Sequence, residues 1–151
     1  MDLQTSYLVK NFEALSVKEL YACLQLRSEV FVVEQNCPYL DIDGKDQESY
    51  HLFLYANGDL AGYTRILPAG LSFSEVAIGR VVTSPKFRGK GLGSILMQAS
   101  INACFDLFGA CDIRIGAQYH LSKFYQSLGF EEDGSPYDED GIPHIEMMRK
   151  S

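Results

Sequence analysis

The chain has 151 residues, and its 13 lysines and arginines against 20 aspartates and glutamates give a formal charge of −7 at pH 7. An acidic chain lacks the basic face that nucleic acid requires and is repelled by anionic membranes, whereas amines and other cations suit its charge. With 46% hydrophobic residues, a chain of this length buries a sizeable core, which we expect to be one domain over residues 1–151.

Targeting and metal-binding patterns are missing from the sequence. No stretch approaches the ~20 apolar residues of a membrane-spanning helix, and the N-terminal residues lack the basic and apolar regions of a secretion signal. We therefore expect a cytoplasmic protein. The four cysteines have no metal-type spacing with the three histidines, so we expect mostly buried free thiols and no metal, although Cys104 and Cys111 could meet after folding.

The N-terminal part of the chain predicts a strand followed by a helix. The strand is expected within residues 6–14. Ser16 and Glu19 have the spacing of a capping box, and apolar residues then recur at helical intervals, which predicts a helix over residues 17–33.

An acidic loop and a hairpin follow this helix. Residues 39–48 carry four acids around one glycine, and we expect them to form a solvated loop. Two strands, 51–56 and 60–67, flank Asn57 and Gly58, a pair that closes hairpins because both residues tolerate positive φ. The acids of the loop are Asp41, Asp43, Asp46 and Glu48.

The remaining elements alternate between strands and helices. A strand rich in Val and Ile covers residues 75–83 and ends at Ser84-Pro85. Helical spacing then predicts a long helix over residues 91–108. The last elements predicted are a strand over 112–118, a short helix over 120–128, an acidic stretch over 131–140 and a strand near 144–149.

A glycine-rich segment, Arg88-Gly89-Lys90-Gly91-Leu92-Gly93, lies between the strand that ends at Pro85 and the long helix. Glycines let backbone N–H groups converge on an anion, and the free N–H groups of a helix start add the positive end of its dipole. The spacing fits neither the P-loop nor the GxGxxG fingerprint of dinucleotide-binding folds. The segment therefore predicts a phosphate-binding loop of another kind, or a tight turn.

Two segments resemble signatures of the GCN5-related N-acetyltransferase (GNAT) family. The family's pyrophosphate loop has Gln or Arg, two residues, Gly, one residue, then Gly or Ala, which Arg88, Gly91 and Gly93 match. The segment from Phe124 to Phe130 resembles the Phe-Tyr-x-x-x-Gly-Phe signature on the family's fourth helix. The two segments stand in the family's order, separated by one helix and one strand.

Four further segments look like the ElaA-type branch of this family, a small bacterial group. With them the resemblance spans most of the chain, from about Leu20 to Arg149. The segments are Glu29 to Gln35, Asp41 to Asp43, Gly116 to His120, and Asp140 to His144.

The resemblance implies an α/β fold of the α+β kind: a mixed, mostly antiparallel sheet of about seven strands, splayed after the fourth, with helices on both faces. Acetyl-CoA would bind as cosubstrate, its pyrophosphate on the glycine loop and its pantetheine along the fourth strand, where the family has a bulge whose N–H binds the thioester oxygen. A solvated Lys90 and a core position for Phe124 are the alternatives at two of these positions. The implied cofactor contacts are Val81, Val82, Thr83, Arg88, Gly89, Lys90, Gly91, Leu92, Gly93, Ser94 and Phe124.

The resemblance also implies catalytic roles. Tyr125 would donate a proton to the departing CoA thiolate, and a phenol stays protonated at neutral pH. A base must take a proton from the amine, and Glu34 and His144 rank first because they lie in branch-like segments. Ranked below them are Glu75, Asp41 and Asp43.

Three features are open to two interpretations each. Arg80, in a strand of Val and Ile, either lines the site or forms a structural ion pair. His120 is a helix cap or a binding residue. The acidic segments 41–48 and 131–140 either attract a cationic acceptor through their field or are solvated loops.

The sequence therefore predicts an N-acetyltransferase that moves an acetyl group from acetyl-CoA to a primary amine in a ternary complex. The acceptor is expected to be a small molecule or a peptide, and a homodimer is compatible with the family. Two other hypotheses are open: a non-catalytic acyl-CoA-binding sensor that contacts a protein partner, and an unrelated α/β domain whose glycine loop is only a turn.

Overall fold

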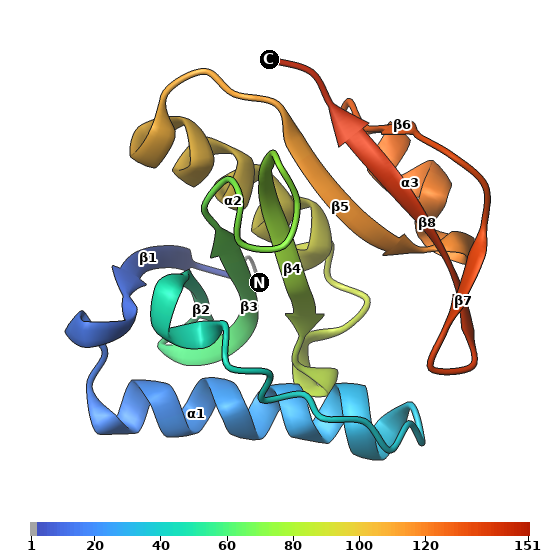
Figure 1. Cartoon of the computed structure of the whole chain (residues 1–151). Coiled ribbons are helices and arrows are strands. Elements are labelled where there is room, and N and C mark those ends of the chain that lie inside the picture. Colours follow the sequence, from blue (N-terminus) through green and yellow to red (C-terminus); the bar gives the residue numbers. More distant parts are fainter. Residues whose placement is uncertain (1–2) are drawn as a thin grey trace.

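The computed structural model describes residues 3–151, so the first two residues of the predicted domain, Met1 and Asp2, lie outside the described part. The chain folds into one sheet with helices on both faces (Figure 1). Its elements are β1 (Thr5–Asn11), α1 (Val17–Arg27), β2 (Tyr50–Ala56), β3 (Asp59–Leu67), β4 (Val76–Thr83), α2 (Leu92–Phe108), β5 (Ile113–Gln118), α3 (Ser122–Gln126), β6 (Glu131–Glu132), β7 (Tyr137–Glu139) and β8 (Ile142–Arg149).

The sheet has eight strands in the order β1-β2-β3-β4-β5-β8-β6, with β7 also paired to β8. Every pairing is antiparallel except that of β4 with β5. The mixed, mostly antiparallel sheet is confirmed. The resemblance implied about seven strands, and six were placed along the sequence. The acidic stretch supplies the other two, the short strands β6 and β7, which both pair with β8.

Helix α1 begins as its sequence predicts. The Ser16 side chain accepts a hydrogen bond from the Glu19 N–H, and the Glu19 carboxylate accepts one from the Ser16 N–H, which completes the capping box. After Arg27 the helix continues as a π-helix over Ser28–Glu34. The predicted helical span is therefore right, but its last seven residues wind more widely, a form that recurs at functional sites.

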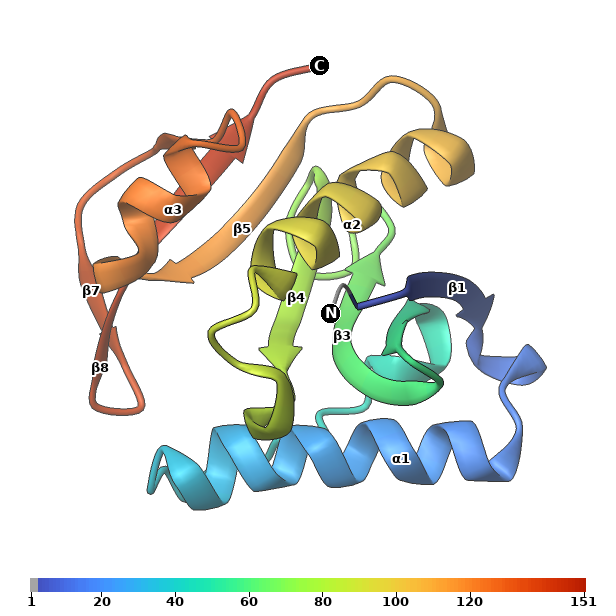
Figure 2. The ribbon, with the colours of Figure 1, turned by 180° about the vertical axis from the view of Figure 1, so that it is seen from behind.

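Two apolar clusters occupy the two faces of the sheet. Helix α2 packs on one face, where Leu96, Met97 and Ile101 meet the strands. Helix α1 packs on the other face through Cys23 and Leu26. Figure 2 shows α2 and α3 together on the face opposite α1. The four cysteines are free, as predicted.

The sheet opens between β4 and β5. These parallel strands pair only at Val76 with Ile113 and at Ala77 with Arg114, and beyond that point they diverge (Figure 1). The predicted splay after the fourth strand is therefore confirmed. Beyond the split, the facing edges of β4 and β5 have no strand partner in the described structure.

A bulge in β4 lies at the start of this opening. Tyr63 pairs with Val82 and Arg65 with Gly79, so two residues of β4 stand opposite one residue of β3. Arg80 has φ +50, which is uncommon for a side-chain-bearing residue. The extra residue reverses the alternation of the strand. Ile78 and Val81 pack on the α2 face, whereas Val82 packs on the α1 face.

Among residues 3–151, no helix is both long and apolar enough to cross a membrane.

Candidate active site

A cavity of about 570 Å³ fills the opening between β4 and β5. Its walls are residues 77–83 of β4 and 115–118 of β5, together with part of the π-helix, the loop before β2 and the β7–β8 hairpin. Several of the residues singled out in the sequence line it: Arg80, Val81, Val82, Thr83, Arg88, Tyr125 and His144.

The glycine loop at the start of α2 has an anion-binding geometry. Gly89 and Gly91 have φ of +78 and +76, and a side chain added at either would meet no atom within 4 Å. Gly91 is the N-cap of α2 and gives it no side-chain cap, so the first N–H groups of the helix, beginning at Leu92, are available to an anion. The Leu92 side chain is buried in the core, so only its backbone can take part.

The other residues of this loop lie around the same helix start. Lys90 and Ser94 are exposed. Gly93 faces Phe124, whose Cζ lies 3.6 Å from the position of an added Cβ. Phe124 packs partly against the core, so it connects the glycine loop to α3.

Arg88 does not point freely into solvent but is held by Glu34 at the end of the π-helix. Its Nη2 lies 2.6 Å from Glu34 Oε1, and its Nη1 donates to Oε2 at 2.8 Å. The hydrogen bond from Arg88 lowers the pKa of the Glu34 carboxyl. A lowered pKa makes Glu34 a weaker proton acceptor, which suits a partner of Arg88 better than a base.

Tyr125 is buried at the cavity wall. Its ring meets those of Phe124 and Phe130 edge to face, and burial raises the pKa of its phenol to about 12. At neutral pH the group is therefore protonated and can donate a proton into the cavity.

His144 lies on β8 with one ring nitrogen fixed. Its Nδ1 lies 2.7 Å from the carbonyl oxygen of Ile142, and because a carbonyl only accepts, Nδ1 carries the hydrogen. Nε2 then has a free lone pair in the neutral ring. Glu139 Oε2 lies 3.5 Å from Nε2. The Glu139 carboxylate can therefore stabilise the imidazolium that forms when Nε2 is protonated.

Glu75 and His120 lie outside the walls of this cavity. Glu75 pairs with Arg114 at 3.0 Å, and its pKa is lowered by the hydrogen bond from that arginine. This pair borders a separate cavity of about 450 Å³. His120 is exposed in the turn before α3.

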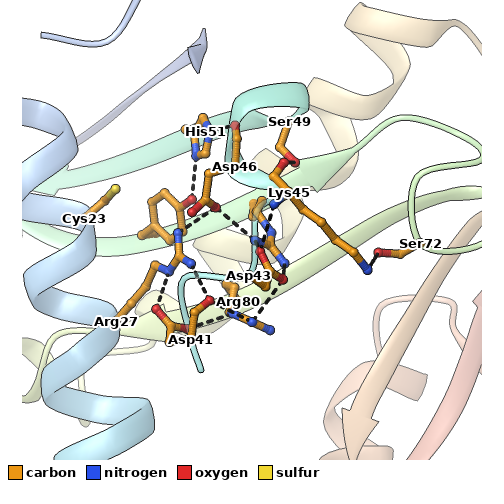
Figure 3. A network of polar contacts seen from close by, with 12 residues as sticks. Cys23, Arg27, Asp41, Asp43, Lys45, Asp46, Ser49, His51, Ser72 and Arg80 are labelled. Atoms are coloured by element: carbon orange, nitrogen blue, oxygen red, sulfur yellow. Dashed lines mark hydrogen bonds and ion pairs between the residues drawn. The ribbon is translucent and has the colours of Figure 1, made fainter. Parts of the chain in front are cut away.

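The acidic loop before β2 forms a closed ring of six charges with three arginines (Figure 3). In this ring each aspartate bridges two arginines and each arginine bridges two aspartates. The N–O distances lie between 2.8 and 3.3 Å for the pairs Arg27–Asp41, Asp41–Arg80, Arg80–Asp43, Asp43–Arg65, Arg65–Asp46 and Asp46–Arg27.

Burial makes this ring a structural unit rather than a surface feature. Arg27 is fully buried and also stacks over the ring of Tyr63, 5.8 Å from its centroid. His51 binds the Asp46 carbonyl through Nε2 and the Tyr63 hydroxyl through Nδ1. The expectation of a solvated acidic loop, or of a field that attracts cations, is therefore wrong for Asp41, Asp43 and Asp46, because arginines neutralise all three.

Both interpretations of Arg80 are correct, because it forms structural ion pairs in the ring and also lines the cavity. Sequence reasoning missed the ring itself. A signal was present for two of its members, because Arg65 and Arg80 stand in largely apolar strand segments and a buried guanidinium needs a carboxylate partner. The spacing of the three aspartates did not reveal which arginine each would meet.

Comparison with known proteins places the chain in a family. A family model described as an acetyltransferase (GNAT) domain matches residues 16–151. ElaA of Escherichia coli K12 is 47% identical over 138 residues, which cover 90% of each chain. A UPF0039 protein of Schizosaccharomyces pombe is 40% identical over 143 residues, 93% of this chain and 94% of that one.

Solved structures agree with the sequence matches. The crystal structure of E. coli ElaA has a TM-score of 0.90 at 43% identity and covers 97% of this chain and 100% of its own. An acyl-CoA N-acyltransferase from Pseudomonas aeruginosa has a TM-score of 0.91 at 42% identity, with 97% and 99% covered.

The chain therefore belongs to the GNAT family of acyl-CoA-dependent acyltransferases. Within that family it stands in the ElaA-like branch.

Proposed function

We propose that this protein transfers an acetyl group from acetyl-CoA to a primary amine by direct attack in a ternary complex. The observation that carries the proposal is that one cavity joins an arginine of the glycine loop, the open edge of β4, a buried tyrosine and a histidine with a free Nε2. An anion site, a binding edge, a proton donor and a proton acceptor thus line the same space.

The glycine loop and β4 would hold the cosubstrate. The N–H groups from Gly89 to Ser94, with the charges of Arg88 and Lys90, suit a pyrophosphate at a helix N-terminus. Val81, Val82 and Thr83 lie on the free edge of β4, where a pantetheine amide chain can pair as an added strand. The bulge at Arg80 turns a backbone N–H out of the ladder, where it can stabilise charge developing on the thioester oxygen.

His144 and Tyr125 would perform the proton transfers. His144 Nε2 takes one proton from the ammonium form of the acceptor, and the neutral amine nitrogen then attacks the thioester carbonyl carbon. As the C–N bond forms, the C–S bond breaks, and the Tyr125 hydroxyl gives its proton to the leaving CoA sulfur. The acylated nitrogen loses its second proton, which restores the Tyr125 hydroxyl, and His144 releases the first proton to solvent. The products are an N-acetylated amine and CoA with a free thiol.

Thiol release from acetyl-CoA by the purified protein tests this function, with a panel of polyamines, amino sugars, amino acids and short peptides. The four cysteines of the protein require an enzyme-only blank. Initial rates with both substrates varied should give intersecting lines, because a ternary complex requires both to be bound. Binding of acetyl-CoA without release for any amine would favour a non-catalytic sensor.

A further inference from the structure

The cavity has a second end, away from the glycine loop. Ser72 and Phe73 line it there, just before β4 begins, together with Lys45 from the loop that carries the aspartate ring. Because β4 and β5 pair only at their first residues, this is the closed end of the split. An acceptor would occupy this region beside the thioester.

The wall on the side of the ring carries an uncompensated positive charge. Among residues 3–151, the Lys45 ammonium forms no ion pair with a carboxylate, and it donates a hydrogen bond to Ser72 Oγ at 2.8 Å. The ring beside it contains three arginines and three aspartates, so its formal charges sum to zero. Figure 3 shows the Lys45 side chain running out of the network to Ser72.

Two further donors line the same cavity as this ammonium group. The Ser72 hydroxyl accepts from Lys45, so its own O–H is free to donate. The side chain of Arg80 is 22% exposed and contacts the ring through Nε and Nη2, whereas its Nη1 donates no hydrogen bond among residues 3–151. Lys45, Ser72 and Arg80 therefore offer donors for an anionic group of one charge.

The opposite wall of the cavity carries negative charge. The β7–β8 hairpin brings Glu139, Asp140 and His144 to the cavity. Cys37 donates through Sγ to the Asp140 carbonyl at 3.4 Å, which ties the hairpin to the loop after the π-helix. An ammonium group is attracted to Glu139 and Asp140, and Nε2 of His144 lies beside Glu139 to receive its proton.

From these two walls we propose that the acceptor is a short peptide, bound through its C-terminal carboxylate to Lys45, Ser72 and Arg80 while its N-terminal amine faces His144. His144 pairs with Gln118, the last residue of β5, so the two contacts lie at different ends of the cavity and an extended peptide is needed to span them. A carboxylate matches the single uncompensated charge of Lys45 better than a doubly charged phosphate does. The inference rests on the proposed function and names its substrate class.

Matched peptide pairs test it: Ala-Ala-Phe with its C-terminal amide, and Gly-Gly-Leu with its C-terminal amide, each with acetyl-CoA and followed by thiol release. We expect kcat/KM for the free-acid peptide to exceed that of its amide by about 10- to 100-fold, the range of a charge-assisted hydrogen bond. In Lys45→Met and in Ser72→Ala this ratio should fall, most in Lys45→Met. Lys18→Met, an exposed lysine on α1, is the matched control and should keep the ratio.

Each of the other outcomes contradicts one specific part of the proposal. Equal or better transfer to the peptide amides overturns the acceptor class and leaves acetyl transfer standing. A preference that Lys45→Met does not reduce overturns the assignment of the carboxylate site. Acetyl-CoA binding without transfer to any amine overturns the proposed function as well, so the two failures are distinguishable.

Discussion

Glu34 holds Arg88 through both carboxylate oxygens, at 2.6 and 2.8 Å, and so connects the end of the π-helix to the glycine loop. The sequence suggested separate roles for the two residues, a base for Glu34 and a phosphate contact for Arg88. In the structure the acid instead competes with any phosphate for the same guanidinium.

Replacing Glu34 by Gln should therefore tighten acetyl-CoA binding. Arg88 is then free for the pyrophosphate, and the dissociation constant from calorimetry should fall by about two- to fivefold, the worth of an exposed ion pair. The gain should shrink at high salt. Glu29→Gln, at an exposed acid of the same π-helix, is the control. A loss of turnover by about 100-fold with unchanged binding would instead show that Glu34 is the base.

Gly91→Glu should abolish most acetyl-CoA binding without unfolding the protein. A carboxylate at the N-cap of α2 repels the pyrophosphate and occupies its space, so we expect the dissociation constant to rise by about tenfold or more. Gly58→Glu imposes the same kind of strain, since Gly58 has φ +87 and open space around it in the β2–β3 turn. If both variants lost binding alike, the effect would come from destabilisation and not from the loop.

The aspartate ring predicts a loss of stability in acid. Burial alone would raise the pKa of Asp46, but hydrogen bonds from Arg27 and Arg65 outweigh it and hold the pKa below its usual value. Burial would also raise the pKa of Asp43, and there the hydrogen bond from Arg65 is the main cause that lowers it instead. Because the folded pKa lies below the unfolded one, the stabilisation is complete above about pH 4 and is lost as the pH falls toward the folded values.

Urea unfolding at a series of pH values checks this, with Asp46→Asn as the variant. At neutral pH the neutral amide of this variant would leave two buried guanidinium groups short of a counter-charge, and the free energy of unfolding should drop by about 3–5 kcal/mol. Its dependence on acid pH should be shallower than that of the unmodified protein. Asp106→Asn, an exposed acid on α2, should change stability by no more than about 0.5 kcal/mol. A similarly small effect of Asp46→Asn would contradict the account of the ring.

His144→Gln should lower kcat by about 100-fold or more while leaving acetyl-CoA affinity nearly unchanged. Glutamine has no lone pair basic enough to take the amine's proton, and the contribution of general base catalysis is of this size. Steady-state rates and calorimetry measure the two quantities. His120→Gln, at an exposed histidine outside the cavity, should retain full activity, and equal losses in the two variants would remove His144 from the mechanism.

Local signals in the sequence were enough to predict most of the fold. The Ser16–Glu19 capping box and the turn at Asn57 and Gly58, with φ of +51 and +87, fix element ends through neighbouring residues alone. Strands β6 and β7 were not foreseen because they are short, exposed and without apolar alternation. They form because both of them pair with β8. The change to a π-helix after Arg27 left no pattern that distinguishes it from an α-helix.

Site residues could be proposed from the sequence only where a contiguous motif marks them. The glycine loop and Tyr125 lie in such motifs, and the structure places Arg88, at the head of the loop, and Tyr125 on one cavity. Contacts between distant segments could not be predicted, because residue type does not identify the partner. Glu34 meets Arg88 across 54 positions, and Arg65 meets Asp43 across 22. Each of these pairs changed the interpretation of a charged residue.

The most direct test of the account compares the unmodified protein with Tyr125→Phe, by thiol release from acetyl-CoA with an accepted amine and by calorimetric binding of acetyl-CoA. The account predicts amine-dependent release that falls by about 100-fold in the variant, since a general acid is lost, with an unchanged dissociation constant. The phenyl ring keeps its contacts with Phe124 and Phe130, so the fold is retained. Unchanged release in Tyr125→Phe, or loss of binding together with release, would contradict the assignment of Tyr125 as the proton donor.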